Sequence, residues 1–255
     1  MIPIKTPQEI EIMKKGGKIA AKVLDRTLAA AQPSVSTLEL DHLAEKLILE
    51  AGGKPSFKGF ENYPFATCIN INEGVVHGLP TKRNLKVGDV VTVDLGIFYQ
   101  GFHTDNARTT RVGRWKMEDG RWKRDQGRFL DTGREALKEA IDQCRIGKTV
   151  GDISHTIQTI VEKAGCQVTR ELGGHGVGKK LHEPPFIPGF GRPGAGPALA
   201  EGMTLAVEVI YTAGNGKIEV LNDGWTIVTA DGQPAGLFEH SIAITASGPI
   251  ILTKC

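Results

Sequence analysis

The sequence predicts an α+β fold built from two similar halves. A pair of amphipathic helices ends at Ala51-Gly52 in the first half, and a second pair ends at Ala164-Gly165. After each pair, an apolar run starts at a glycine and ends at an acid, over residues 88–94 and 202–208. Two such units are too few for an open solenoid. We therefore expect the halves to pack about a pseudo-twofold axis, with a largely antiparallel sheet and the helices outside it.

The halves are expected to span about 6–112 and 128–255 of a single domain, residues 1–255. The first two helices each begin at a capping box, Thr6-Pro7-Gln8-Glu9 and Ser36-Thr37-Leu38-Glu39, because a hydroxyl three residues before a glutamate satisfies exposed backbone N–H groups. Alternating and apolar runs predict strands, and 3.6-residue periodicity predicts the second helix pair. The predicted strands are 66–72, 90–95 and 107–112, and the later helices are 128–145 and 150–164.

Residues 113–128 have a different character. Gly113-Arg114-Trp115-Lys116 is repeated as Gly120-Arg121-Trp122-Lys123, and Asp119-Gly120 between them is typical of a tight turn. We interpret the segment as a surface β-hairpin. Its basic and aromatic side chains could touch RNA, but a solvated hairpin is the favoured interpretation.

Composition excludes several classes of protein. The formal net charge of +2 gives no reason to expect a specific nucleic-acid partner. No apolar run has the length of a membrane span, and the first residues lead into a helix instead of a signal peptide. The cysteines form no C-x-x-C pair, so they are expected to be reduced, in a cytoplasmic protein.

A glycine-rich stretch at 173–184 holds two histidines, His175 and His182. Glycines at this density allow the backbone to approach a ligand closely, although such clusters more often mark simple turns. The run from Gly173 to Lys179 resembles part of a phosphate-binding loop. That function is rejected because Lys180 stands where the motif requires Ser or Thr for magnesium.

Acidic residues at the ends of apolar strands carry the functional argument. Burying a lone carboxylate costs several kcal/mol, yet Asp94 and Glu208 occupy equivalent places in the repeat. Asp105 returns beside Asp94 across a turn, and Glu239 opens a late strand. Four converging carboxylates with His175 are tolerable only around cations. Such a set can bind two divalent ions, and oxygen-rich ligands suit manganese, iron or cobalt, with zinc also allowed.

These residues resemble the five-ligand signature of the methionine aminopeptidases, and most closely the bacterial type I enzymes. The similarity covers nearly the whole chain. It includes the segments 55–59, 71–73, 77–80 and 223–226, in addition to the ligands Asp94, Asp105, His175, Glu208 and Glu239. The resemblance implies the pita-bread fold, two pseudo-symmetric halves around a curved sheet, which agrees with the repeat.

The resemblance also implies a role for each residue. Asp94 would chelate one ion, His175 and Glu208 the other, and Asp105 and Glu239 would bridge them. Glu208 would accept the proton of a metal-bound water or hydroxide. His182 would donate to the carbonyl oxygen of the scissile bond, and His77 would hydrogen-bond its amide nitrogen side.

A methionine pocket is implied as well, lined by Phe57, Phe60, Tyr63, Cys68, Leu181 and Trp225. For Phe57 and Phe60, a purely structural role in the core is an equally good interpretation. The chain departs from the family at Val209, where proline usually follows the ligand glutamate. Phe57, Phe60 and Leu181 also stand where type I relatives often have Cys, Tyr and Phe, so the shape of the pocket differs in detail.

The implied activity is removal of the initiator methionine from nascent proteins and peptides with a small second residue. The expected partners are therefore nascent N-termini, with proximity to the ribosome, and the expected state is a monomer. One alternative is a peptidase acting on X-Pro substrates, but those enzymes usually carry an additional N-terminal domain, and we expect no room for one before the repeat begins near residue 6. Another is a non-catalytic binding protein of this fold, but such relatives lack the metal ligands.

Overall fold

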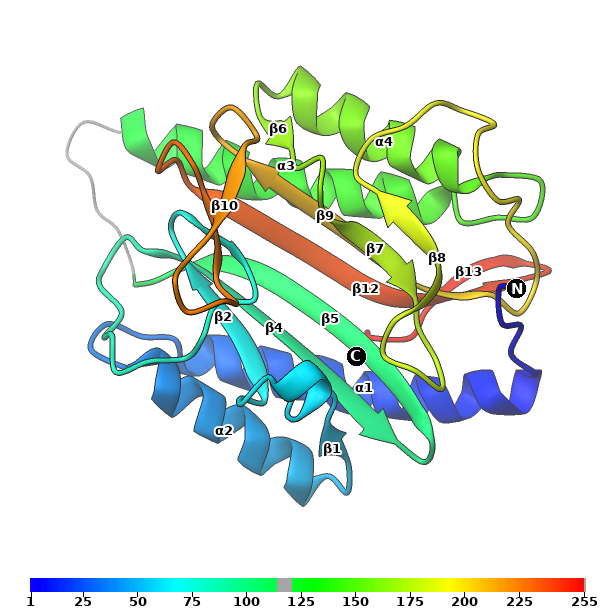
Figure 1. Cartoon of the computed structure of the whole chain (residues 1–255), viewed down its shortest axis with the longest axis horizontal. Helices are drawn as coiled ribbons and strands as arrows, with labels where there is room; N and C mark the ends of the chain where they lie inside the picture. Colours follow the sequence, from blue (N-terminus) through cyan, green and yellow to red (C-terminus); the bar gives the residue numbers. More distant parts are fainter. Residues whose placement is uncertain (114–120, 255) are drawn as a thin grey trace.

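The computed structural model describes residues 1–113 and 121–254, with side chains over 1–113 and 127–254. Four α-helices flank a curved sheet (Figure 1). The helices are α1 (Pro7–Ala30), α2 (Thr37–Glu50), α3 (Arg121–Asp142) and α4 (Val150–Lys163). The strands are β1 (Lys54–Pro55), β2 (Thr67–Ile71), β3 (Gly74–Val76), β4 (Val90–Tyr99), β5 (Phe102–Arg111), β6 (Gln167–Val168), β7 (Gly173–Gly176), β8 (Glu183–Pro188), β9 (Thr204–Thr212), β10 (Ile218–Val220), β11 (Ile227–Thr229), β12 (Ala235–Thr245) and β13 (Gly248–Ile251).

The main sheet follows the order β1-β4-β5-β12-β9-β7-β8, and every pairing in it is antiparallel. Strands β2, β13 and β6 pair with β4, β12 and β9, and β10-β11-β3 form a small second sheet. Helix α1 packs on β4 and β5, with α2 beside it against β1 and β2. Helix α3 packs on β9 and β12, with α4 beside it against β6 and β8. This arrangement confirms the predicted α+β pita-bread architecture.

Both predicted capping boxes are present. The Thr6 backbone N–H donates to Glu9 Oε2 at 2.8 Å, while Thr6 Oγ1 accepts from the Glu9 N–H at 3.3 Å. Ser36 and Glu39 form the same reciprocal pair at the start of α2. The turn between β4 and β5 places Gln100 and Gly101 at positive φ, the geometry that matches the twist of a two-residue hairpin.

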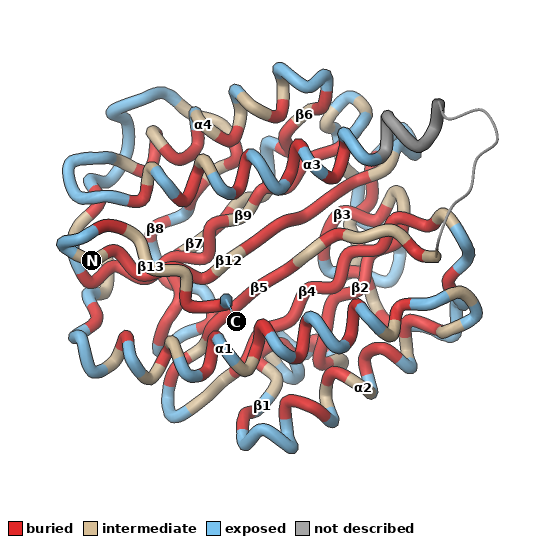
Figure 2. The backbone as a smooth tube through the Cα atoms, turned by 180° about the vertical axis from the view of Figure 1, so that it is seen from behind, coloured by how far each residue is buried: buried red, intermediate tan, exposed pale blue. Residues whose placement is uncertain are grey.

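Apolar side chains from the helices and the sheet form the core, which Figure 2 shows as the continuous buried backbone between them. In the first half, Ala20 and Leu24 of α1 and Ile48 of α2 pack on Val93 and Leu95 of β4. In the second half, a larger cluster joins α3 and α4 to β9 and β12. No helix among the described residues is both long and apolar enough to cross a membrane.

The two halves meet where β5 lies beside β12. Here side-chain hydroxyls enter the backbone pairing. Ser241 Oγ accepts from the Asp105 N–H and donates to the Asp105 carbonyl, both at 2.8 Å. Thr109 Oγ1 does the same with the N–H and carbonyl of Leu237, again at 2.8 Å. These hydroxyl contacts join the halves at the middle of the sheet.

The predicted hairpin at 113–128 is wrong over its second half, because residues 121–128 are the first turns of α3. The helix also begins earlier than the predicted 128. Residues 121–128 contain no proline and no β-branched residue, and Arg, Lys and Gln are good helix formers, so local preference extends the helix toward its N-terminus. The predicted turn at Asp119-Gly120 lies outside the described residues.

Candidate active site

The five predicted ligands come from five neighbouring strands of the main sheet. Glu208 of β9 lies directly opposite Glu239 of β12. Asp105 of β5 pairs with Gly96, two residues along β4 from Asp94. His175 of β7 pairs with Ala206, two residues along β9 from Glu208. Since side chains two residues apart point to the same face of a sheet, all five project from one face.

The side chains converge as the register requires. Ligand atoms of Asp105, His175 and Glu239 all lie within 4.8 Å of one another. His175 Nε2 lies 3.5 Å from Glu208 Oε1. Asp94, Asp105 and Glu239 are at most 8% exposed. The cluster is therefore an interior site with little access to bulk water.

Burial gives these carboxylates unusual proton affinities. It raises the pKa of Asp105 to about 7. Burial raises the pKa of Asp94 as well, and the charges of Asp105 and Glu208 raise it further. The pKa values of Glu208 and Glu239 are raised by the same two causes, burial and neighbouring carboxylates. Uncompensated negative charge at this density is unstable, and nearby cations would remove the penalty.

Two further observations fit divalent metal ions. One oxygen each of Asp94, Asp105 and Glu239 is buried with no hydrogen-bond partner in the described part of the chain. Buried polar atoms of this kind are rare in native proteins without a ligand. His175 Nδ1 lies 2.8 Å from the Gly176 carbonyl oxygen, so an Nδ1–H there leaves Nε2 as the lone-pair nitrogen facing the carboxylates. Burial lowers the pKa of His175 to about 4, which keeps the ring neutral as a metal ligand.

The two other predicted histidines lie beside the cluster. The ring of His182 is 4.4 Å from that of His175 and 5.1 Å from that of Phe60, edge-on in both cases. Burial and the neighbouring His182 lower the pKa of His77. Burial also lowers the pKa of His182. Both rings are therefore neutral near pH 7, and each has one N–H to donate.

An apolar pocket adjoins the carboxylates. Phe57, Tyr63, Cys68 and Leu181 form a buried cluster, with Phe60 and Trp225 packed against it. The Tyr63 hydroxyl donates to the Thr67 carbonyl at 2.9 Å, and its ring meets that of Trp225 edge-on at 5.1 Å. Cys68 lies opposite Asp94 in the β2–β4 pair. Burial raises the pKa of its thiol, so this cysteine is an unreactive, polarisable part of the wall.

The carboxylates and the apolar wall face one cavity of about 590 Å³. Every predicted site residue lines it. These residues are Phe57, Phe60, Tyr63, Cys68, His77, Asp94, Asp105, His175, Leu181, His182, Glu208, Trp225 and Glu239. Leu172 and Ile210 also line it, although the sequence patterns did not indicate either residue. Ile210 could have been found from strand periodicity, since it lies two residues beyond Glu208 on β9.

The structure shows how valine is accommodated at position 209, where the family usually has proline. Val209 is buried inside β9 and is paired with Phe238 of β12. Unlike proline, valine retains a backbone N–H and is free in φ, so this strand needs no break after Glu208. The predicted ligand Glu208 keeps its place within β9.

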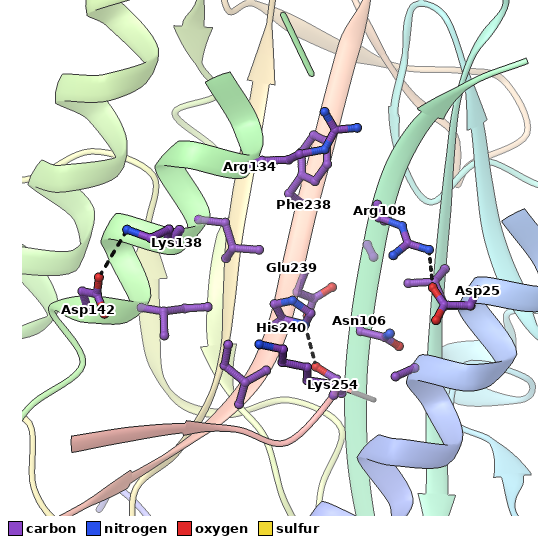
Figure 3. Close-up of a pocket in the computed structure, with 17 residues that line it drawn as sticks. Asp25, Asn106, Arg108, Arg134, Lys138, Asp142, Phe238, Glu239, His240 and Lys254 are labelled. Atoms are coloured by element: carbon purple, nitrogen blue, oxygen red, sulfur yellow. Dashed lines mark hydrogen bonds and ion pairs between the residues drawn. The ribbon is translucent and has the colours of Figure 1, made fainter. Parts of the chain in front are cut away.

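A second cavity, of about 560 Å³, lies on the opposite face of the sheet between α1 and α3 (Figure 3). Phe238 and His240 flank Glu239 on β12, so they point into this groove and away from the ligand cluster. Two of its acids, Asp25 and Asp142, have basic partners, as in the Arg108–Asp25 pair at 2.5 Å, and Glu239 lines both cavities. Arg134 lies over the Phe238 ring at 5.6 Å. Among the described residues, Asp94 and Asp105, each with an unpartnered oxygen, line the first cavity but not this groove.

Comparison with known proteins agrees with the geometry. The model of metallopeptidase family M24 matches residues 11–246. A methionine aminopeptidase of Clostridium perfringens is 41% identical over 253 residues, 99% of each chain. Methionine aminopeptidase 1 of Bacillus subtilis is 41% identical over 254 residues, 100% of each chain.

Solved structures separate two branches of this fold. A methionine aminopeptidase from Thermotoga maritima matches with a TM-score of 0.95 at 43% identity, over 100% of both chains. A prolidase from Pyrococcus furiosus matches with a TM-score of 0.77 at 25% identity, and the match covers 99% of this chain but 65% of the prolidase. The chain therefore belongs to metallopeptidase family M24 and, within it, to the methionine aminopeptidases.

Proposed function

We propose that this chain hydrolyses the peptide bond after an N-terminal methionine, in nascent proteins and peptides whose second residue is small. The observation that carries this proposal is the meeting of two features in one cavity. A buried set of metal-ligand side chains lies beside an apolar pocket of a size and softness that suit a thioether.

The proposed cofactor is a pair of divalent ions, with cobalt, manganese, iron and zinc as candidates. Asp94 would hold one ion, His175 and Glu208 the other, and Asp105 and Glu239 would bridge both. The orphaned oxygens of Asp94, Asp105 and Glu239 support this assignment. Bound divalent ions lower the pKa of water and polarise a carbonyl group, which provides a nucleophile near neutral pH.

Three side chains of the cavity would carry out the remaining steps of the hydrolysis. Glu208 would accept the proton of the water, since its carboxylate lies inside the cluster, with Oε1 3.5 Å from His175 Nε2. His182 would donate its N–H to the scissile carbonyl oxygen as negative charge develops there, and a positioned donor of this kind contributes about 3–4 kcal/mol. His77 would bind the amide nitrogen side of the same bond and help to align the peptide.

The pocket would confer the preference for methionine. Tyr63 and Trp225 offer aromatic surface to sulfur, and Phe57, Phe60 and Leu181 close the remaining walls. The proposed setting is the cytoplasm, where the enzyme acts as a monomer on chains emerging from the ribosome.

The decisive experiment compares two substrates and several ions. Metal-stripped protein is assayed with Met-Ala-Ser and with an Ala-Pro peptide, and manganese, iron, cobalt or zinc is then added back singly. We expect metal-dependent release of methionine from Met-Ala-Ser alone. Cleavage of Ala-Pro instead would indicate a proline peptidase, and cleavage of neither with metal bound would indicate a binding protein.

A second expected result concerns the residue after methionine. Peptides that begin Met-Ala or Met-Gly should be cleaved at least about 100-fold faster, by kcat/KM, than those beginning Met-Leu or Met-Lys, because a closed wall costs a larger side chain several kcal/mol. The comparison uses otherwise identical peptides. Equal rates for Met-Ala and Met-Leu would contradict a restricted site beside the pocket.

A further inference from the structure

A buried ion pair joins the start of the chain to the loop that carries His182. Lys5 and Glu183 are 5% and 8% exposed, and Lys5 Nζ donates to Glu183 Oε2. The other carboxylate oxygen, Oε1, accepts from the Lys180 N–H at 3.1 Å. Glu183 is also the first residue of β8, opposite Gly176 of β7. Both oxygens of Glu183 are thus used to fix the 180–183 turn.

Lys5 is itself held firmly. Its backbone N–H donates to the Gly202 carbonyl at 2.8 Å, and the next residue, Thr6, caps α1. Its side chain crosses Gly178 so closely that a Cβ there would lie 2.3 Å from Lys5 Cε. The Gly178 carbonyl in turn accepts from the His103 N–H at 2.7 Å. The ammonium group of Lys5 is therefore a rigid anchor for the turn.

The His182 ring depends on this turn for its position. In the described part of the chain the ring has edge-on contacts with His175 and Phe60 but no hydrogen-bond partner. Its place in the cavity therefore follows from its backbone. That backbone is bonded directly to Glu183, whose carboxylate is fixed by Lys5.

Stability alone does not explain a charged pair here. A buried ion pair can often be replaced by apolar residues of similar size with no loss of stability, because desolvation offsets the attraction. The Lys5–Glu183 pair instead fixes the position of the 180–183 turn. We propose that Lys5 is a positioning residue, which fixes His182 at the scissile carbonyl through Glu183. This inference rests on the proposed function.

The test is a double-mutant cycle on metal-loaded full-length protein with Met-Ala-Ser. Lys5→Met keeps the side-chain stem and removes the charge, and we expect kcat to fall about 10-fold or more with KM within about 3-fold, the pattern of a lost transition-state contact. In a His182→Ala background the same change should alter kcat less than about 2-fold. Equal effects of Lys5→Met in both backgrounds would overturn the proposal, since they would indicate a general structural role.

Further variants distinguish the positioning role of Lys5 from a general effect of surface charge and from a failure to fold. Lys5→Arg should retain kcat within about 3-fold, because the charge can still reach Glu183. Lys179→Met removes the partly exposed Lys179–Glu9 pair at 3.1 Å on the same turn, and should leave kcat unchanged. If Lys5→Met does not fold, the Lys5→Met/Glu183→Leu variant leaves no unpaired charge and enters the same cycle. Wild-type kcat in that folded double variant would contradict the proposal.

A readout without substrate distinguishes this inference from the proposed function. In protein with isotope-labelled histidine, Lys5→Met or the double variant should shift the NMR resonances of His182, and Lys179→Met should not. Failure of wild-type protein to cleave Met-Ala-Ser would reject the proposed function. An unchanged His182 resonance in the Lys5 variants would reject the positioning role by itself.

Discussion

Asp105→Asn should abolish most peptidase activity while making the metal-free protein more stable. We expect kcat/KM for Met-Ala-Ser to fall at least about 100-fold, since even the outer partners of metal ligands are worth 10- to 100-fold. The amide removes a negative charge that burial disfavours. Activity, bound metal and thermal midpoint with and without added ion test both parts. Glu239→Gln should behave in the same way.

The stability of the metal-free protein should also depend on pH, in a direction that the pKa of Asp105 determines. The pKa of Asp105 is raised to about 7, so the folded metal-free protein binds its proton more tightly than the unfolded chain does. Stability of the metal-free protein should therefore fall as the pH rises from about 4 to about 7, and Asp105→Asn should flatten that fall. Asp25→Asn, at an exposed pair with Arg108, is the control and should change little. Wild-type turnover and metal content in Asp105→Asn would refute the bridging role.

Gly174→Ala should damage both the sheet and the site. A Cβ at this position would lie 2.3 Å from the Ala206 carbonyl oxygen of β9, a backbone atom that cannot move without separating β7 from β9. Overpacking of this kind costs about 3 kcal/mol, which should lower the midpoint of a chain this size by about 6–12 °C. His175 is the next residue, so metal binding and activity should fall as well.

Gly127→Ala provides the matched control for this substitution. Gly127 lies inside α3, and a Cβ there would meet nothing within 4 Å. Alanine is the better helix former, so this variant should be more stable by up to about 1 kcal/mol and fully active. Thermal unfolding and metal titration of the two variants side by side measure the difference. A Gly174→Ala protein as stable as Gly127→Ala would show that β7 is not so closely packed.

Local chemistry explains what could be predicted from the sequence. The capping boxes at Thr6 and Ser36 depend on residues three apart, and Asp94 and Glu208 each stand six residues after a glycine, at the end of an apolar run. The repeat then indicates that these two acids come together where the halves pack. The sequence predicts the start of α3 too late, at 128, because the tryptophan and glycine residues near 120 are typical of a hairpin. From residue 121 onward, the helix preference of the side chains is the stronger signal.

Long-range contacts could not be predicted in this way. Lys5 and Glu183 are 178 residues apart, and nothing local to either indicates the other. Leu172 enters the cavity because the short strand β7 runs between β8 and β9, a consequence of sheet order. Such contacts follow from the packing of whole elements, so a single sequence without relatives carries little signal for them.

The seam between β5 and β12 also divides the proposed ligand set. Asp94 and Asp105 come from one side of it, and His175, Glu208 and Glu239 come from the other. Ser241 fastens the seam at Asp105 itself. Neither half alone carries the complete set. The site therefore forms only when the two halves have folded and packed together. A half-folded copy of the chain is therefore expected to be inactive, because it holds only part of the proposed ligand set.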